Sequence, residues 1–308
     1  MRNLESSLFS PYENAFSPAE PLSGYAFSLC GGPCGGLFRI EDGEMLKNLV
    51  QCCIRESIPY KVLGGMTNIL ISDEGLDGIV LLNRKGSVTH TIQNDGSILL
   101  EADSGASMAG AVRYCIENEI SGLEWAAGLP GSVGGAVCGN AGAFGSEISQ
   151  IFSSGTVIDE KGAIRTIDNT DMDFGYRSSA MKHQANKNIL LKAVFHLEKG
   201  QKEQISAKGE TYKETRRNTQ PIEQHSLGSV FKNPEGESAG KLIQAAGLKG
   251  ITIGKAQVSM KHANFITTEK GVTSTDYHRL VVHVQKTVFE QFRVLLEPEI
   301  EMLGFELK

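Results

Sequence analysis

Apolar residues recur at helical spacing in several parts of the chain. In residues 41–57 the apolar side chains stand three and four positions apart, so they share one face of a helix. Residues 108–119 repeat this spacing, and Ser107 directly before them is a suitable N-cap. The other predicted helices are a charged one at residues 201–218, a short one at residues 238–247 and a long one at residues 275–293.

Short apolar runs between these helices predict β-strands. Two hairpins are expected, because Asn94, Asp95 and Gly96 separate one pair of runs and residues 160–162 separate another. The remaining predicted strands are residues 60–65, 69–73, 78–83, 188–199, 263–268 and 294–303. This mixture of helices and strands predicts an α+β fold.

The same pattern suggests how the chain is divided. Residues 1–22 lack the apolar run of a signal peptide, and we expect them to form a flexible arm. We place the main domain boundary at the start of the charged helix. It separates residues 23–200 from a C-terminal domain of residues 201–308.

Composition and charge narrow the class of protein. With 40% hydrophobic and 21% charged residues, the chain has the composition of an ordinary globular protein, and it lacks the run of about 18 apolar residues that spans a membrane. Its net charge of −6 argues against nucleic-acid binding. The first 200 residues carry 15 Lys/Arg against 23 Asp/Glu, and the rest carry 15 against 13. A more basic C-terminal third fits an anionic small ligand or a solvated surface. We expect a cytoplasmic protein.

The six cysteines do not have metal-site spacing. Cys30 and Cys34 lie in a Gly/Pro turn, and Cys52 and Cys53 lie in a helical pattern. Neither pair is followed by a second CxxC or by histidines at finger spacing. We therefore expect buried or incidental thiols and predict no metal site.

Glycine is concentrated in two turns. The first turn reads Gly64–Gly65–Met66–Thr67–Asn68, and the second lies in residues 122–145, which contain eight glycines. Bare backbone permits close approach, and exposed N–H groups at a turn can bind phosphate. However, both the GxGxxG fingerprint and the GxxxxGK[ST] loop are absent. A phosphate-binding role and a purely structural one both remain open at this point.

Seven stretches, of which two contain the glycine turns, occur in a characteristic order. They are LGGMTNILISDEGLDG, GLEWAAGLPGSVGGAVCGNAGAFGSEI, FGYRSSAMK, RRNTQP, GSVFKNPEGESAGKLIQAAGLKG, GKAQVSMKHANFI and LEPEIEMLG. The chain thereby resembles the UDP-N-acetylenolpyruvoylglucosamine reductase family over residues 27–304. The resemblance implies NADPH-dependent, FAD-mediated reduction of UDP-N-acetyl-3-O-(1-carboxyvinyl)glucosamine to UDP-N-acetylmuramate. That reaction serves peptidoglycan synthesis, and through the cell wall it serves cell shape and division.

The resemblance also implies a fold and a cofactor site. FAD would lie, without a covalent link, in a lobe of the PCMH/vanillyl-alcohol-oxidase type whose subdomains are residues 23–85 and 86–200, with residues 201–308 as the substrate-binding domain. Only small molecules, the UDP-sugar and NADPH, are implied as partners. The implied cofactor contacts are Gly64, Gly65, Met66, Thr67, Asn68, Gly128, Pro130, Gly131, Ser132, Gly134, Gly135, Asn140 and Gly142.

Two motifs depart from the family pattern. The first glycine turn is usually G-x-G-S-N, so Met66 and Thr67 replace a glycine and a serine. We expect Met66 to adopt a backbone angle acceptable to an L-residue. We also expect the turn to bind the pyrophosphate of the cofactor less tightly. The N-terminal T-x-R-x-G-G-P motif is reduced to FSLCGGPCG, with no arginine.

The resemblance assigns the chemistry to three residues. Arg177 would bind the substrate carboxylate, Ser229 would donate a proton, and Glu299 would be the catalytic glutamate. Tyr176, Lys232 and Asn233 would contact the substrate. From the residues alone, the simpler interpretation of Arg177 is a surface or salt-bridged arginine, that of Ser229 a turn residue, and that of Glu297 and Glu299 two solvent-facing carboxylates. The short connection of residues 180–188 indicates the family form without an extra substrate-closing loop.

Several alternatives stay open. Arg216 and Arg217 could bind diphosphate or lie on a solvated helix face, and His262 is better explained as a structural histidine. The whole chain could be another flavin oxidoreductase of the same superfamily. It could also be a non-catalytic scaffold that binds flavin or a nucleotide sugar.

Overall fold

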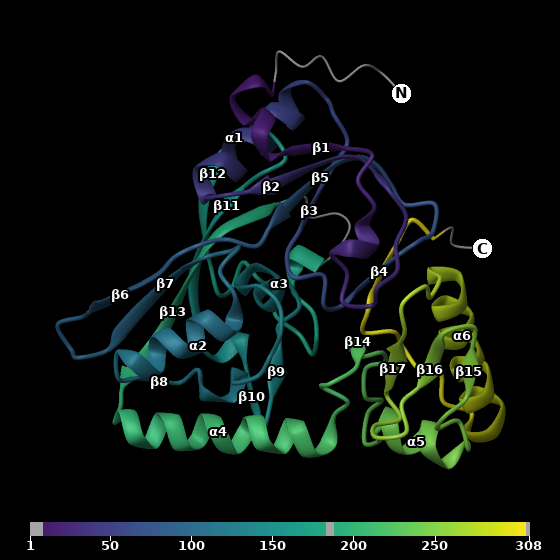
Figure 1. Ribbon diagram of the computed structural model, residues 1–308. Helices are drawn as coiled ribbons and strands as arrows, with labels where there is room; N and C mark the ends of the chain where they lie inside the picture. Colours follow the sequence, from purple (N-terminus) through teal and green to yellow (C-terminus); the bar gives the residue numbers. More distant parts are fainter. Residues whose placement is uncertain (1–8, 183–187, 306–308) are drawn as a thin grey trace. The chain divides into compact units, whose positions relative to one another are not determined.

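A computed structural model describes residues 9–182 and 188–305, and these residues form two compact units (Figure 1). Each unit is assembled from three stretches of chain. The first unit comprises Met1–Pro18, Gly36–Gly65 and Asp77–Glu214, and the second comprises Ala19–Gly35, Met66–Leu76 and Thr215–Lys308. Each is described by itself below.

One sheet of the first unit contains four strands covered by one helix. Its order is β1 (Phe16–Pro18), β2 (Cys34–Ile40), β5 (Leu76–Asn83) and β3 (Tyr60–Leu63), with β3 and β5 parallel. The predicted first helix is confirmed as α1 (Gly43–Arg55), and the Asp42 side chain caps it. The α1 face that contains Leu46 and Leu49 packs with Phe38 and Leu81 of the sheet in one buried cluster.

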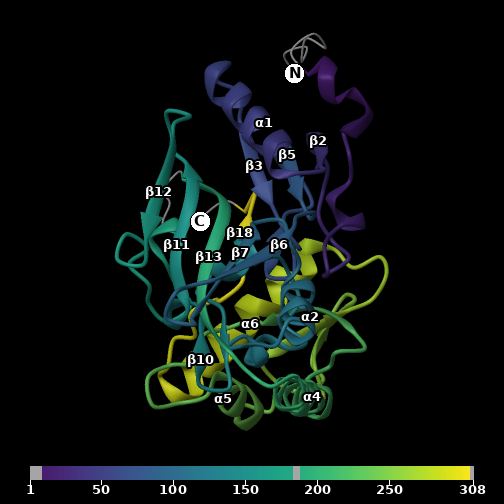
Figure 2. The same ribbon diagram turned by 90° about the vertical axis from the view of Figure 1, so that its left-hand side faces the viewer.

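The second sheet of this unit follows the predicted hairpins. Figure 2 shows β11 (Phe152–Ile158), β12 (Ile164–Asp168) and β13 (Ile189–Lys199) side by side. Strand β13 also pairs with β7 (Ile98–Asp103), which pairs with β6 (Val88–Ile92), and with the short β8 (Ile120–Ser121). Both hairpins and the long strand are therefore confirmed.

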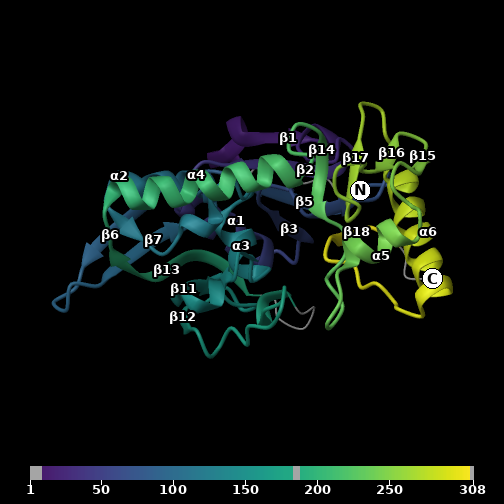
Figure 3. The ribbon, with the colours of Figure 1, turned by 90° about the horizontal axis from the view of Figure 1, so that it is seen from below.

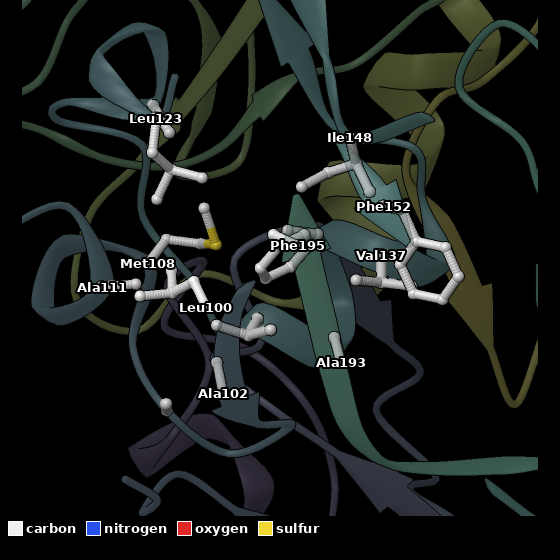
Figure 4. Packing of buried hydrophobic residues seen from close by; sticks show 14 of the residues in the cluster. Leu100, Ala102, Met108, Ala111, Leu123, Val137, Ile148, Phe152, Ala193 and Phe195 are labelled. Atoms are coloured by element: carbon white, nitrogen blue, oxygen red, sulfur yellow. The ribbon is translucent and has the colours of Figure 1, made fainter. Parts of the chain in front are cut away.

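Two helices pack on this second sheet. The predicted second helix is α2 (Met108–Glu117), whose N-cap Ser107 accepts from the Gly110 N–H. Helix α3 (Val133–Cys138) begins inside the glycine-rich stretch. Figure 4 shows the resulting core, in which Leu100 of β7, Met108 of α2, Val137 of α3 and Phe195 of β13 point into one apolar cluster.

The second unit has a four-stranded antiparallel sheet and two helices (Figure 3). Its strand order is β14 (His225–Ser229), β17 (Phe265–Thr268), β16 (Ala256–Val258) and β15 (Thr252–Ile253). The predicted helices appear as α5 (Ala239–Ala245) and α6 (Ser274–Phe292). One face of α6 is buried, and Phe292 at the end of the helix is exposed; the buried hydrophobic residues are Tyr277, Leu280, Val281, Val284 and Val288. A separate parallel pair joins β4 (Ile69–Ile71) to β18 (Glu301–Leu303).

The remaining elements connect these parts. The charged helix α4 (Lys202–Thr219) runs through the boundary between the units. The others are β9 (Gly142–Ala143), β10 (Ser146–Glu147) and the 3₁₀ turns η2 (Ser10–Ala15), η3 (Leu22–Gly24), η4 (Glu124–Ala126), η5 (Ile148–Gln150) and η6 (Ala180–Lys182). Within the part of the chain that the structure describes, no helix is both long and apolar enough to cross a bilayer.

Two expectations from the sequence need correction. The described part of the N-terminal arm is folded, because the Phe9 ring packs at a tilt against Phe38 with ring centroids 5.1 Å apart and β1 pairs with β2. Residues 294–303 do not form one strand; only Glu301–Leu303 does. Pro298 in the middle of this segment has no N–H to donate, so a long ladder through it is disfavoured. The short connection of residues 180–188 lies partly outside the described residues.

Candidate active site

The two glycine turns meet inside the first unit. A Cβ atom placed on Gly64 would lie 2.2 Å from Oγ of Ser132, and one on Gly65 would lie 2.7 Å from Cα of Gly131. Side chains at these two positions would therefore separate the turns. The glycines that the sequence singled out have a structural reason to be there, and the structure brings both turns together.

Met66 occupies a conformation that the sequence analysis excluded. Its φ of +52° lies in the left-handed region, where a side chain costs about 1–2 kcal/mol. The Met66 side chain is 2% exposed, and burying a methionine contributes about 1.5–3 kcal/mol, which offsets that cost. The expectation of an ordinary backbone angle was wrong: Met66 adopts a positive φ, and burial of its side chain offsets the cost.

Two glycines of the second turn, Gly134 and Gly135, have different surroundings. The Gly134 N–H donates to the Ser104 carbonyl at 2.8 Å, and a Cβ on Gly134 would lie 3.0 Å from both Cβ and O of Ser104. Glycine at position 134 therefore permits close packing within the protein. A Cβ on Gly135 would meet only Oγ of Ser132, at an ordinary 3.5 Å. Gly128, Pro130 and Gly135 are exposed. These three positions leave backbone open to a ligand.

Arg84 was missed by the sequence analysis. Its Nε donates to the Gly64 carbonyl at 3.1 Å and its Nη2 to the Gly65 carbonyl at 3.0 Å. A permanent positive charge thus stands beside the first glycine turn, where it would favour an anion. The sequence signal is faint, since Arg84 is merely a cation directly after strand β5.

The end of the glycine-rich stretch holds the Tyr176–Arg177 loop. Nη2 of Arg177 donates to the Gly142 carbonyl at 2.7 Å, and Oγ of Ser179 donates to the Cys138 carbonyl at 2.7 Å. Arg177 itself has a φ of +55°, and its guanidinium carbon lies 5.1 Å from the centre of the Tyr176 ring. The arginine is therefore fixed at both its backbone and its side chain.

The buried side chain of Asn140 forms a hydrogen bond to the same loop. It is fully buried, donates from Nδ2 to the Gly175 carbonyl at 2.9 Å and accepts from the Ser149 N–H at 2.9 Å. Both ends of the amide thus bind backbone. The Asn140 side chain therefore fixes the shape of this loop.

In the second unit the structure brings Ser229 and Glu299 onto adjacent segments. A β-bulge interrupts the pairing of β14 with β17 just before Ser229, and Gly228 in the bulge has a φ of +76°. Such a bulge redirects the side chain that follows it. The next residue, Val230, accepts at its carbonyl from the Glu299 N–H at 2.8 Å.

Pro298 sits at a position that needs no donor. Phe231 and Pro298 form an isolated antiparallel bridge, and the flanking bond runs from the Lys232 N–H to the Glu297 carbonyl at 2.9 Å. The proline thus occupies the non-hydrogen-bonded place in a very short ladder. Glu297 and Glu299 flank it, with Glu297 exposed and Glu299 half-buried.

Asn68 fixes the other edge of this segment. Its Nδ2 donates to the Glu299 carbonyl at 3.1 Å, and its own carbonyl accepts from the Glu301 N–H at 2.9 Å. The side chain that the family resemblance assigned to the cofactor therefore binds the segment that contains Glu299, directly before strand β18. Thr67 beside it is half-buried.

The expected substrate residues have protein partners. Nζ of Lys232 lies 2.6 Å from a carboxylate oxygen of Glu297, which is an exposed group. Oδ1 of Asn233 accepts from the Ala239 N–H at 3.1 Å, near the start of α5. An exposed ion pair contributes little stability, so an anionic ligand could displace Glu297 from Lys232.

Other titratable groups are structural in character. Arg216 is buried, and burial lowers the pKa of its guanidinium, so it does not lie on a solvated face. Nδ1 of His262 accepts from the Asn264 N–H, and burial lowers the pKa of this imidazole, as expected for a structural histidine.

The cysteines are free thiols, and all but Cys138 are buried. Burial raises the pKa of Cys53 and of Cys115 to about 12, which keeps both protonated.

Comparison with known proteins gives a consistent result. The family model for the C-terminal domain of UDP-N-acetylenolpyruvoylglucosamine reductase matches residues 220–303, and the model for an FAD binding domain matches residues 35–168. The reductase of Pediococcus pentosaceus is 40% identical over 287 residues, which cover 93% of this chain and 94% of that protein. The reductase of Limosilactobacillus reuteri is 40% identical over 285 residues, covering 92% and 94%.

A solved structure agrees with these matches. The crystal structure of the reductase from Thermus caldophilus superposes with a TM-score of 0.77 at 31% identity. The match covers 92% of this chain and 98% of that one. The likeness therefore extends over both units and is not confined to the glycine turns.

Proposed function

Because the chain belongs to the UDP-N-acetylenolpyruvoylglucosamine reductase family, we propose that Arg177, Ser229 and Glu299 carry out the chemistry of that reaction. The protein is an NADPH-dependent flavoenzyme that reduces UDP-N-acetyl-3-O-(1-carboxyvinyl)glucosamine to UDP-N-acetylmuramate in peptidoglycan synthesis. Its fold is the expected α+β one, a PCMH-type FAD-binding lobe with a C-terminal substrate-binding domain.

The first unit suits a diphosphate-bearing cofactor. Backbone is open at Gly128, Pro130 and Gly135, the two glycine turns are in contact, and the Arg84 guanidinium stands beside the Gly64 and Gly65 carbonyls. When bound, FAD supplies transfer of a hydride from NADPH to the enolpyruvyl double bond. We propose that it binds without a covalent link at the positions expected from the sequence, with Asn140 acting through the loop.

Arg177 has the chemistry to bind the substrate carboxylate. A planar guanidinium carries a permanent charge and can hold both carboxylate oxygens at once. As the terminal carbon of the double bond gains hydride, negative charge moves toward that carboxylate, so a fixed cation stabilises the transition state. The bond from Nη2 to the Gly142 carbonyl restricts the guanidinium before substrate arrives.

The assignment of Ser229 and Glu299 rests on one observation, which is that their backbone segments are adjacent. The Glu299 N–H donates to the Val230 carbonyl at 2.8 Å, directly after Ser229. A hydroxyl is a neutral donor that can protonate the substrate carbon next to the carboxylate, and a carboxyl group from the adjacent segment can hydrogen-bond the developing charge. We assign the proton donation to Ser229 and the second function to Glu299.

The other assignments are proposals of the same kind. Tyr176, Lys232 and Asn233 would contact the substrate, and residues 201–308 would supply its binding domain after an FAD-binding domain of residues 23–200. UDP-sugar and NADPH are the small-molecule partners. We further propose that the protein works in the cytoplasm and binds neither nucleic acid nor membrane.

A spectroscopic assay tests the function as a whole. The purified protein is expected to be yellow, to release its flavin on acid precipitation, and to oxidise NADPH only when the enolpyruvyl sugar nucleotide is present. NADPH oxidation that depends on a small alcohol or needs no sugar nucleotide would indicate another flavin oxidoreductase. Bound flavin without turnover would indicate a scaffold.

A further inference from the structure

Asn264 makes paired hydrogen bonds to a single residue of the active-site segment. Its Nδ2 donates to the Phe231 carbonyl at 2.8 Å, and its Oδ1 accepts from the Phe231 N–H at 3.0 Å. Its own carbonyl accepts from the Val230 N–H at 2.8 Å. The Asn264 side chain is 4% exposed, so water has little access to these bonds.

The amide stands where the main-chain ladder stops. Strands β14 and β17 pair as far as Ser229 with Phe265, and Asn264 lies in the turn just before β17. Beyond that point, among the residues that the structure describes, no strand pairs with Phe231 on this side. A side-chain amide presents an N–H donor and an acceptor oxygen side by side in one plane, so it can replace a strand partner.

The segment held in this way connects the two proposed catalytic residues. Ser229 precedes Val230 in the chain, and Glu299 is bound to the Val230 carbonyl on the opposite side of the segment from Asn264. A displacement of Val230 and Phe231 would therefore move both Ser229 and Glu299. Displacements of about 1 Å in an active site can cost about 10²-fold in rate.

We propose that Asn264 is a positioning residue for proton delivery, acting on Ser229 and Glu299 through the backbone of Val230 and Phe231. This inference rests on the proposed function. Leaving the Phe231 N–H or carbonyl unpaired in a buried place is unfavourable, so removal of the amide should let the segment shift toward other partners. Asn264 itself needs no contact with the substrate.

The test separates the two halves of the catalytic cycle in the holoenzyme. Anaerobic stopped-flow absorbance follows flavin reduction by NADPH and then flavin reoxidation by the enolpyruvyl substrate. In Asn264→Ala and Asn264→Asp we expect reoxidation to slow by about 10- to 100-fold, while reduction stays within about two-fold of the unaltered protein. Asn264→Asp retains the acceptor for the Phe231 N–H. If Asn264→Ala does not fold, the reoxidation rate of Asn264→Asp alone tests the proposal.

Thr268→Val is the matched control. Thr268 lies on β17, is buried, and donates from Oγ1 to the Ser28 carbonyl at 2.9 Å, so its loss also removes a buried side-chain bond to backbone in this unit. It should lower thermal stability and leave both half-reactions within about two-fold. Reoxidation slowed equally by Thr268→Val, or unchanged in both Asn264 variants, would overturn the positioning role.

Ser229→Ala distinguishes this failure from failure of the proposed function. Normal reoxidation in Ser229→Ala would overturn the role of Ser229 itself. Slow reoxidation there, with normal reoxidation in the Asn264 variants, would overturn only the positioning role. If Asn264 acts through Ser229, the double variant Ser229→Ala/Asn264→Asp should slow by less than the product of the two single effects.

Discussion

Met66 combines a backbone conformation typical of glycine with a buried side chain. The motif that this turn resembles usually has glycine at this position, and glycine adopts a positive φ without cost. Here the backbone keeps a φ of +52° and the side chain is buried. The residue therefore combines backbone strain with apolar burial, and the two contributions can be separated by substitution.

Met66→Gly should be more stable than Met66→Ala by about 1 kcal/mol, although both lose the buried side chain. Alanine keeps the left-handed strain and glycine does not. At Leu280, a buried residue within α6, the order should reverse, because glycine is about 1 kcal/mol worse than alanine inside a helix. Denaturant unfolding of the four variants measures both differences. The same order at the two positions would contradict this account of Met66.

Ser229 provides the sharpest test of the chemistry at the scale of one residue. Ser229→Ala should leave flavin reduction by NADPH near normal, because that half-reaction needs no proton on the sugar. Reoxidation by the enolpyruvyl substrate should slow by about 10²-fold or more, the scale expected for a positioned proton donor. Ser229→Cys should recover part of the loss, since a thiol also donates. Equal slowing of both half-reactions would show that the serine only shapes the site.

At the scale of elements, much of the architecture depends on side chains that bind backbone far away in the sequence. Asn140 and Ser179 join the glycine-rich stretch to the Arg177 loop, and Asn68 joins its turn to the strand after Glu299. Asp73 does the same for α6. It accepts from the N–H groups of Ser274 and Thr275 and from Oγ1 of Thr275, at 2.8, 2.8 and 2.7 Å.

The Asp73 contacts predict a pH dependence of stability. Burial raises the pKa of Asp73, but hydrogen bonds from Thr275 and Ser274 to the carboxylate outweigh it, so the pKa is lowered from 3.8. A carboxyl with a lowered folded-state pKa stabilises the fold above its unfolded-state pKa and loses that contribution as pH falls through the folded-state pKa. Asp73→Asn should therefore lower Tm at pH 7, with the difference shrinking below about pH 4. A difference in Tm that stays constant down to pH 2 would contradict the assignment.

At the scale of the whole molecule, the second unit is not a continuous C-terminal domain. Besides Thr215–Lys308 it includes Ala19–Gly35 and Met66–Leu76. Leu70 of β4 and Cys30 belong to its buried core, and β4 supplies the partner of β18. A core that draws on three stretches of chain cannot be complete in any one of them.

A fragment of residues 201–308 should therefore fold poorly by itself, although it contains the whole substrate-binding domain expected from the sequence. It lacks β4, which would leave the edge of β18 and the site of Leu70 uncovered. We expect a broad, weakly cooperative thermal transition by circular dichroism and little chemical-shift dispersion in NMR spectra. A sharp transition and well-dispersed spectra would show that the N-terminal stretches are dispensable.

The sequence by itself determined the features that depend on neighbours along the chain. Helical spacing predicted α1 and α6, turn residues predicted both hairpins, and ordered motifs predicted the family, because each signal lies within a few adjacent positions. Only the tertiary structure decided the left-handed angle of Met66, the start of strand β18 at Glu301 and the three-part core of the second unit. It also placed Asn264 against Phe231. These depend on which distant segments bury a side chain or satisfy a backbone group, and no local pattern specifies that partner.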